Sequence, residues 1–384
     1  MKTRHAHKHL EISRYLLSEI ASGKYTETDR LPSEVQLAKR FKVSRPTAAR
    51  ALRDLTTEGI IERRAGSGSY VRNKANAAPT TRQIGLLIPG LGTTEIFEII
   101  CGELASLARI SEYSLLWGGS THPRVDKDGS REHAREICEQ FIERKVTGVF
   151  FAPFELTVGK DEINRNIADR FSEACIPMVL LDRDLAVFPQ NGHFDLIGLD
   201  NVAAGYMLAE HLIKLGCKRL AFLMRPLSAP TVERRYAGAR EALARHKLEV
   251  YPDWLQVGNP QDEKFVSSLV AGNKWDAVIC ANDFTAAQLI RTLENARFHV
   301  PQDIRVAGFD DAKYATLVSV PITTIQQPCK DIASVAFQTM LSRVADPTLP
   351  ARHIMLPPRL VVRESCGAYL RQKHKMDHRE ERGR

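Results

Sequence analysis

Apolar residues recur at helical spacing twice between residues 31 and 57. Ser33 and Gln36 are spaced as a capping box, so a helix is expected to begin there and to carry Val35, Leu37, Ala38 and Phe41. Ser44 can cap a second helix, whose apolar stripe at i, i+3, i+4 and i+7 consists of Ala48, Ala51, Leu52 and Leu55. Such a stripe packs inward and turns four polar side chains outward, namely Arg45, Thr47, Arg50 and Arg53.

A glycine-tipped hairpin is expected directly after the second helix. Residues 60–71 are predicted to form two short strands joined by a turn. Gly66 and Gly68 would let the turn approach a sugar-phosphate chain closely, and Arg63 and Arg64 can neutralise phosphates. Helix, turn, helix and hairpin in this order predict a winged helix-turn-helix that binds double-stranded DNA.

The start of the second helix carries groups suited to base recognition. Arginine can bind guanine O6 and N7 bidentately, and a threonine methyl can touch thymine, so Arg45 and Thr47 are the expected base contacts. One small winged domain buries too little surface for tight specific binding. We therefore expect a homodimer that reads a pseudo-palindromic operator.

The stretch LPSEVQLAKRFKVSRPTAARALRDLTTEGIIERRAGSGSYV closely resembles the N-terminal domain of GntR-type bacterial transcription regulators. The resemblance covers about residues 10–72. It implies DNA contacts at Ser33, Ser44, Arg45, Thr47, Arg50, Arg63, Arg64, Gly66 and Gly68. One position departs from the pattern: the family often has Arg two residues after the Thr, where this chain has Ala49 followed by Arg50.

The basic charge of the chain is concentrated in the segment predicted to bind DNA. The whole chain has 54 Lys and Arg against 46 Asp and Glu, a net charge of +8. Residues 1–82 hold 17 Lys and Arg against 8 Asp and Glu, a net of +9, whereas the remaining 302 residues hold 37 against 38, a net of −1. This distribution favours a polyanionic partner for the N-terminal part.

The sequence gives less support to a membrane protein, a disulfide-bonded or metal-binding protein, or an enzyme. No run of 18 apolar residues occurs and the start, MKTRHAHKHLEIS, lacks an apolar signal core, so we expect no membrane segment and a cytoplasmic location. The seven cysteines stand singly, which favours core thiols over disulfides or zinc, and the histidines near both ends suggest adventitious metal binding only. We expect no catalytic constellation, no metal and no cofactor.

After a polar linker over residues 73–82 the pattern changes to strands alternating with amphipathic helices. Strands are predicted at 84–88, 114–117, 148–152, 178–181, 196–199, 220–224, 277–281 and 304–309. Helices are predicted at 95–109, 131–145, 202–215, 232–246 and 284–296. The fold class is therefore α/β, and so many strands fit two parallel sheets with helices on both faces better than one sheet.

Polar clusters follow three of the predicted strands. They are Asp182-Arg183-Asp184, Asn282-Asp283 and Asp310-Asp311. Ligands of open α/β sheets bind outside the carboxyl ends of the strands, so these clusters predict a shared site. Each cluster alone could equally be a turn or a helix cap.

Residues 83–366 resemble the effector domain of LacI-type repressors, itself similar to periplasmic sugar-binding proteins. Segments that carry the resemblance include MVLLDRD, IGLDNVAAGYMLAEHLIKLGCKRLAFL, ERRYAGAREAL, DAVICANDFTA and VPQDIRVAGFDDA. It implies two Rossmann-like lobes, residues 83–193 and about 194–321, with the C-terminal segments crossing back between them. The tail 367–384 is expected to be disordered.

This second resemblance implies ligand contacts at Asp182 or Arg183, Arg235, Asn282 and Asp310. Phe97 could stack on a sugar ring or could belong to the core, and Trp117, Trp254 and Trp275 are expected to be packing residues. The linker lacks helical apolar spacing, so the hinge helix of LacI-type proteins is not expected here.

The two parts together, residues 1–72 as head and 83–366 as sensor, resemble arabinose-repressor-type transcription regulators. We expect a ligand-responsive homodimeric regulator, a repressor of carbohydrate-use genes whose effector is a small sugar. A purine or nucleoside effector is the alternative within the same architecture. A transport-type solute-binding protein would share the two lobes but would not need the DNA-binding head, and turnover of a sugar or nucleotide would identify an enzyme.

Overall fold

The computed structural model describes residues 8–21, 24–25, 29–57, 60–64, 67–71, 82–89, 96–118 and 129–370. The chain divides into two compact units, Met1–Thr81 and Arg82–Arg384, and each is described by itself. Residues 73–81 of the expected linker lie outside the described residues, and Arg82 begins a strand. Of the expected disordered tail, residues 367–370 form a turn in which the Leu370 amide donates to the Gly367 carbonyl, and the rest lies outside the described residues.

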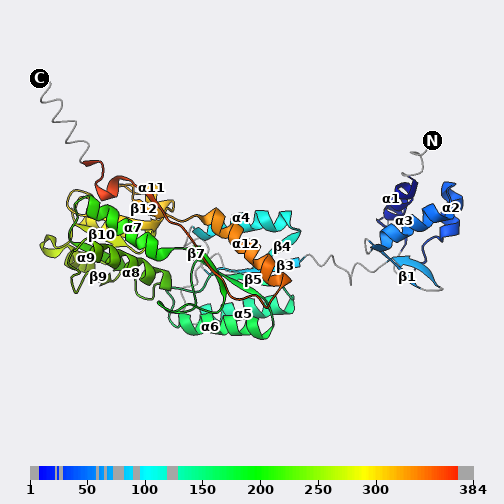
Figure 1. Ribbon diagram of the computed structural model, residues 1–384, viewed down its shortest axis with the longest axis horizontal. Coiled ribbons are helices and arrows are strands. Elements are labelled where there is room, and N and C mark those ends of the chain that lie inside the picture. The colour runs from blue at the N-terminus through cyan, green and yellow to red at the C-terminus, as the bar shows by residue number, and fades with distance from the viewer. Residues whose placement is uncertain are drawn as a thin grey trace, which may run out of the picture. The chain divides into compact units, whose positions relative to one another are not determined.

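The N-terminal unit has the predicted winged helix-turn-helix order (Figure 1). Three helices, α1 (Lys8–Ala21), α2 (Glu34–Phe41) and α3 (Arg45–Thr57), precede an antiparallel hairpin of β1 (Ile61–Arg64) and β2 (Gly68–Val71). Its core consists of Ile12, Leu16, Leu31, Leu37, Ala48, Ala51, Leu52, Leu55 and Ile61. Helix α1 was not predicted, although Ile12, Leu16 and Ile20 recur every four residues, a spacing that places them on one helix face.

The first sheet of the second unit is parallel, with strand order β13-β7-β6-β5-β3-β4. Its strands are β3 (Arg82–Leu87), β4 (Tyr113–Trp117), β5 (Gly148–Phe151), β6 (Met178–Leu181), β7 (Asp195–Leu199) and β13 (His353–Leu356). Helices α4 (Ile96–Ile110) and α12 (Cys329–Ala345) cover one face, and α5 (Gly129–Glu143) and α6 (Lys160–Glu173) cover the other (Figure 1). The strands read as continuous apolar runs because both faces are buried.

The second sheet has the order β14-β12-β11-β10-β8-β9, and only β14 is antiparallel to its neighbour. Its strands are β8 (Leu220–Met224), β9 (Leu255–Val257), β10 (Ala277–Cys280), β11 (Arg305–Asp310), β12 (Thr323–Gln326) and β14 (Arg359–Val361). The helices that follow its strands or lead into them are α7 (Asn201–Lys214), α8 (Pro230–Arg245), α9 (Glu263–Val270), α10 (Asp283–Asn295) and the short α11 (Tyr314–Leu317). Trp254 and Trp275 are buried in this core, as predicted.

The predicted boundary between the lobes is wrong. Residues 196–199 were assigned to the second lobe, but β7 pairs in parallel with β6 and lies in the first sheet. The chain crosses to the second lobe after β7, returns with α12 and β13, and crosses again to β14. Asp195, at the start of β7, fixes the returning segments because its buried carboxylate accepts from Arg343 Nε at 2.9 Å and from the Arg352 amide at 2.8 Å.

Helices α7 and α8 pack in direct backbone contact. A Cβ built on Gly205 of α7 would lie 1.9 Å from the carbonyl oxygen of Arg235, and one on Gly238 of α8 would lie 1.9 Å from that of Val202. Only glycine fits at both positions, so the crossing determines where α8 holds Arg235. Among the described residues, no helix combines the length and apolar character needed to cross a bilayer.

We expect Gly205→Ala to force α7 and α8 apart and to lower the free energy of unfolding by about 1–3 kcal/mol, the usual effect of overpacking. The matched control is Gly102→Ala in α4, where an added Cβ meets nothing within 4 Å. That change should be neutral or stabilise by up to about 1 kcal/mol, because alanine is the better helix former. Chemical denaturation of both variants measures the difference, and equal effects would contradict the crossing as the cause.

Candidate functional site

Helix α2 begins with the predicted capping box. Ser33 Oγ accepts from the Gln36 amide at 3.3 Å, and the Ser33 amide donates to Gln36 Oε1 at 2.8 Å. The Ser33 hydroxyl, one of the predicted DNA contacts, is therefore already engaged in the helix start. Val35 was expected within the apolar run of this helix, but it lies on the outer face with 59% of its area exposed.

Helix α3 presents its polar face as predicted. Ala48, Ala51, Leu52 and Leu55 are fully buried, whereas Arg45 and Arg50 are exposed and Thr47 is half-buried. The hydroxyls of Ser44 and Thr47 lie 2.8 Å apart at the start of the helix. This hydrogen bond orients the side chain of Thr47, one of the two predicted base contacts.

The wing places Arg63 on β1 and Gly68 at the start of β2. Gly68 has a φ of 125°, and a Cβ there would lie 2.5 Å from Arg30 Nε, so this position requires glycine. Gly66 and the Arg64 side chain, both predicted DNA contacts, lie outside the described residues.

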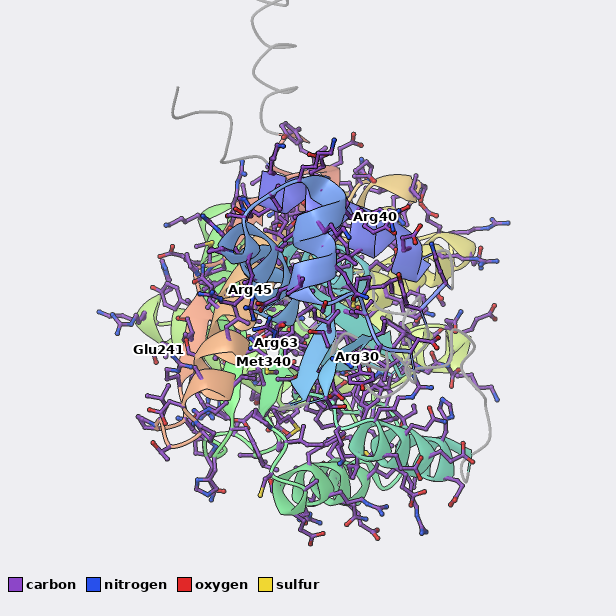
Figure 2. All side chains as sticks on the ribbon, turned by 90° about the vertical axis from the view of Figure 1, so that its right-hand side faces the viewer. Arg30, Arg40, Arg45, Arg63, Glu241 and Met340 are labelled. Atoms are coloured by element: carbon purple, nitrogen blue, oxygen red, sulfur yellow. The ribbon has the colours of Figure 1, made fainter. Side chains whose placement is uncertain are left out.

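One carboxylate joins the two helices and the wing. Glu34, the first residue of α2, accepts from Arg45 Nε at 3.3 Å and from Arg63 Nη2. Arg45 and Arg63 accordingly lie close together in Figure 2. The guanidinium groups of Arg63 and Arg45 lower the pKa of Glu34, so this side chain is a carboxylate at neutral pH.

In the second unit, Arg235 of α8 is the centre of a buried polar cluster. Its guanidinium donates to Asn201 Oδ1 at 2.7 Å, to the Ala281 carbonyl at 2.7 Å and to Asp310 Oδ1 at 3.3 Å. These partners belong to the start of α7 and to the carboxyl ends of β10 and β11. Arg235 therefore connects three elements of the second lobe at the strand ends where a ligand was predicted.

Asp310 connects Arg235 to Gln327 in this cluster. Its Oδ1 also accepts from Gln327 Nε2 at 2.8 Å, and its backbone has a φ of 110°, which is rare for a residue other than glycine. Burial raises the pKa of Asp310 to about 6, against the opposing effect of Arg235. The charges of Asp182 and Glu155 contribute to this rise, which places these first-lobe carboxylates within electrostatic reach of Asp310.

Arg183 is the corresponding guanidinium of the first lobe. It lies 2.8 Å from Glu155 Oε1, 3.3 Å from Asp182 Oδ2 and 3.2 Å from the Pro153 carbonyl. Its Cζ also lies 5.3 Å from the centre of the Phe97 ring. Phe97 itself is buried in the core of the first sheet, which is the packing alternative considered for it.

Among the described residues, two buried acceptor atoms on the side chains that contact Arg183 or Asp310 have no hydrogen-bond partner. They are Asp182 Oδ1 and Gln327 Oε1, on side chains that are at least nine-tenths buried. An unpaired buried acceptor costs about 1–3 kcal/mol. Asp182 also has a φ of 68°, and backbone strain of this kind persists mostly at functional sites.

Asn282 and Asp283 have mainly structural contacts. Asn282 Oδ1 caps α10 by accepting from the Thr285 amide at 2.9 Å. Asp283 is fully buried, and its Oδ2 accepts from the Ala312 amide at 3.1 Å. Burial, together with the nearby charge of Asp310, raises the pKa of Asp283 well above its ordinary value.

Three members of the cluster were missed at the sequence level, namely Glu155, Asn201 and Gln327. Each lies just beyond the carboxyl end of a strand, β5, β7 and β12 respectively. The criterion that indicated Asp182 and Asp310 also applies to Glu155 and Asn201, which follow predicted strands. It could not indicate Gln327, because no strand was predicted at 323–326.

Each of the two units matches a known protein family. Residues 8–71 match the family model of bacterial regulatory proteins, gntR family, and residues 209–366 match a periplasmic binding protein-like domain. The HTH-type transcriptional repressor PurR of Vibrio campbellii is 30% identical over 292 residues, 74% of this chain and 81% of the repressor. The chain belongs to the GntR/LacI-type transcription regulators.

Other relatives fit this assignment. The arabinose metabolism transcriptional repressor of Geobacillus stearothermophilus is 26% identical over 377 residues, covering 95% of this chain and 99% of that protein. Among solved structures, a complex of the transcriptional regulator CelR with cellobiose has a TM-score of 0.64 at 18% identity, covering 87% of this chain and all of that one. CcpA of Lactococcus lactis reaches 0.63 over 74% of this chain and 99% of its own, also at 18% identity. This regulator therefore has a DNA-binding GntR-type domain, followed along the chain by a domain with the predicted LacI-like two-lobed fold.

The raised pKa of Asp283 has a consequence for stability. A group whose pKa is raised on folding contributes stability that is present at low pH and is lost as the pH rises through the folded pKa. Asn resembles a protonated carboxyl in shape, so Asp283→Asn should differ least from the wild type below about pH 4, the ordinary pKa of an aspartate, and should gain in relative stability as the pH rises above it. Urea denaturation of both proteins between about pH 4 and pH 8 measures this, and a difference that does not depend on pH would contradict the raised pKa of Asp283.

Proposed function

We propose that this regulator binds a small, neutral, polyhydroxylated ligand, a sugar, at the cluster around Asp182, Arg183, Arg235, Asp310 and Gln327. Two buried acceptors that have no partner in the described part of the chain, Asp182 Oδ1 and Gln327 Oε1, are the observation that carries the proposal. Hydroxyl groups are the donors that would satisfy them. A sugar has several such groups on one rigid ring, so it could reach acceptors on both lobes.

The charges of the cluster favour a neutral ligand. Arg183 is paired with Asp182 and Glu155, and Arg235 with Asp310, so neither guanidinium is left without a carboxylate. A phosphate or carboxylate ligand would have to displace one of these partners and would meet the remaining negative charges. Nucleosides are the competing class, because the same amide and carboxylate groups can bind a base or a ribose.

On this proposal, Arg45 and Thr47 read operator bases, with Arg50, Arg63 and Arg64 near the phosphates. The regulator acts in the cytoplasm, has no catalytic role, and represses carbohydrate-use genes until the sugar changes its affinity for the operator. The whole-length similarity to an arabinose metabolism repressor supports this assignment. Coupling of this kind is reciprocal, so DNA changes sugar affinity by the same factor.

A thermal-shift screen against a panel of pentoses, hexoses, disaccharides and nucleosides tests the ligand class, because specific binding raises the melting temperature. Arg235→Ala should abolish the shift produced by the best ligand and leave binding to a selected DNA duplex intact. Arg45→Ala should weaken DNA binding by about 1–3 kcal/mol and keep the ligand shift. If only nucleosides raise the melting temperature, the sugar proposal is wrong, and if both variants lose both activities, the two sites are not separate.

We propose further that the active form is a homodimer joined through the region of α10 and α11. Leu317 of α11 is 78% exposed, and beside it lies a groove of about 510 Å³ whose lining includes Phe284, Tyr314 and Val318. An exposed apolar side chain next to a partly apolar groove suits a self-complementary two-fold contact.

Leu317→Asp would place a charge in that contact, so it should yield a monomer with weakened operator binding. Val187→Asp is the matched control, because Val187 is also exposed, at 58%, and does not line the groove. Analytical ultracentrifugation gives the mass of each variant. A dimeric Leu317→Asp protein would place the dimer contact elsewhere, and a monomeric wild type would refute the homodimer.

A further inference from the structure

We infer that Glu34 is a specificity-determining positioning residue, which aims Arg45 and Arg63 at DNA without contacting it. The inference rests on the proposed DNA-reading role of Arg45. Glu34 is 11 residues from Arg45 and 29 from Arg63 along the chain, yet its two carboxylate oxygens accept from both. One side chain thereby links the starts of α2 and α3 to strand β1 of the wing.

Which edge of the Arg45 guanidinium Glu34 contacts determines whether Arg45 can still bind a base. Glu34 Oε2 accepts from Nε, at 3.3 Å, and the side chain of Arg45 is 72% exposed. This contact leaves the Nη1–Nη2 edge of the guanidinium for a partner outside the unit. A bidentate contact with guanine O6 and N7 needs two such parallel donors. The carboxylate therefore restrains the arginine and leaves its reading edge available.

Restraint of this kind has an energetic benefit. Free arginine side chains have many rotamers, and immobilising one at an interface costs about 0.5–1.5 kcal/mol, a factor of about 2 to 13 in affinity. Glu34 restrains two arginines before DNA is met. It remains anionic because the two guanidiniums lower its pKa and because it lies in the first turn of α2, where the helix dipole favours a negative charge.

The same carboxylate has an opposite effect on non-specific binding. Affinity for DNA of any sequence depends mainly on the positive charge brought to the phosphates. Glu34 adds a negative charge beside two basic side chains, so it weakens this sequence-independent term. A single residue would thus strengthen specific binding and weaken non-specific binding, and its main effect is on their ratio.

Glu34→Gln separates these terms, because it removes the charge and nearly keeps the shape. Affinities are measured at one fixed salt concentration for two duplexes, one selected by the wild type from a random-sequence pool and one with the same bases scrambled. We expect affinity for the selected duplex to fall about 3- to 10-fold, affinity for the scrambled duplex to stay equal or rise, and the melting temperature to change little. Glu34→Asp, which keeps the charge but shortens the reach, should also lose specificity without gaining affinity for the scrambled duplex.

Glu11→Gln is the matched control. Glu11 is an exposed acidic residue in the first turn of α1, so it gives the same charge change in the same unit at another place. It should leave the ratio of the two affinities unchanged. If Glu34→Gln raises both affinities equally, Glu34 only competes with DNA, and if both fall together with the melting temperature, its role is only structural. Either result overturns the inference, whereas a wild type that selects no sequence from the pool would refute the proposed function itself.

Discussion

The buried guanidinium of Arg235 is the constraint on which the second lobe's half of the proposed ligand site depends. A charge removed from water has to be paired and hydrogen-bonded, and Arg235 meets this need with Asn201, the Ala281 carbonyl and Asp310. These partners come from three different elements, so they stay in register only if α8 keeps its distance from α7. Gly205 and Gly238 allow the two backbones to meet at that distance. The polar site thus follows from a packing feature of two helices.

Burial decides what an arginine can do in this protein. Arg235 and Arg183 are almost fully buried and are held by carboxylates within the same unit, so they organise a site whose unsatisfied atoms are acceptors. Arg45 also has a carboxylate partner, Glu34, which it contacts through Nε, but its side chain is 72% exposed. The same kind of pairing therefore accompanies unsatisfied buried acceptors in one unit and an exposed guanidinium edge in the other.

The features that local periodicity determines were predictable. The buried stripe of α3, the capping box at Ser33 and the polar strand ends at Asp182 and Asp310 each depend on neighbours within a few residues. The sheet to which β7 belongs was not predictable, because an apolar five-residue strand can pair in either sheet and only long-range packing decides. The role of Asn282 was not predictable either. A residue directly after β10 can contact a ligand or cap the next helix, and Asn282 caps α10.

The three crossings between the lobes bear on how a ligand could act. They follow β7, β12 and β13, and two of these strands are followed directly by members of the polar cluster, Asn201 and Gln327. A ligand can shift a conformational equilibrium only by the difference between its affinities for the two states. In the proposed mechanism, a single ligand can donate to both Asp182 Oδ1 and Gln327 Oε1 in one arrangement of the lobes but not in the other. The difference in affinity arises from this. Coupling between distant sites amounts to about 1–3 kcal/mol, which is the size of satisfying one or two such buried acceptors.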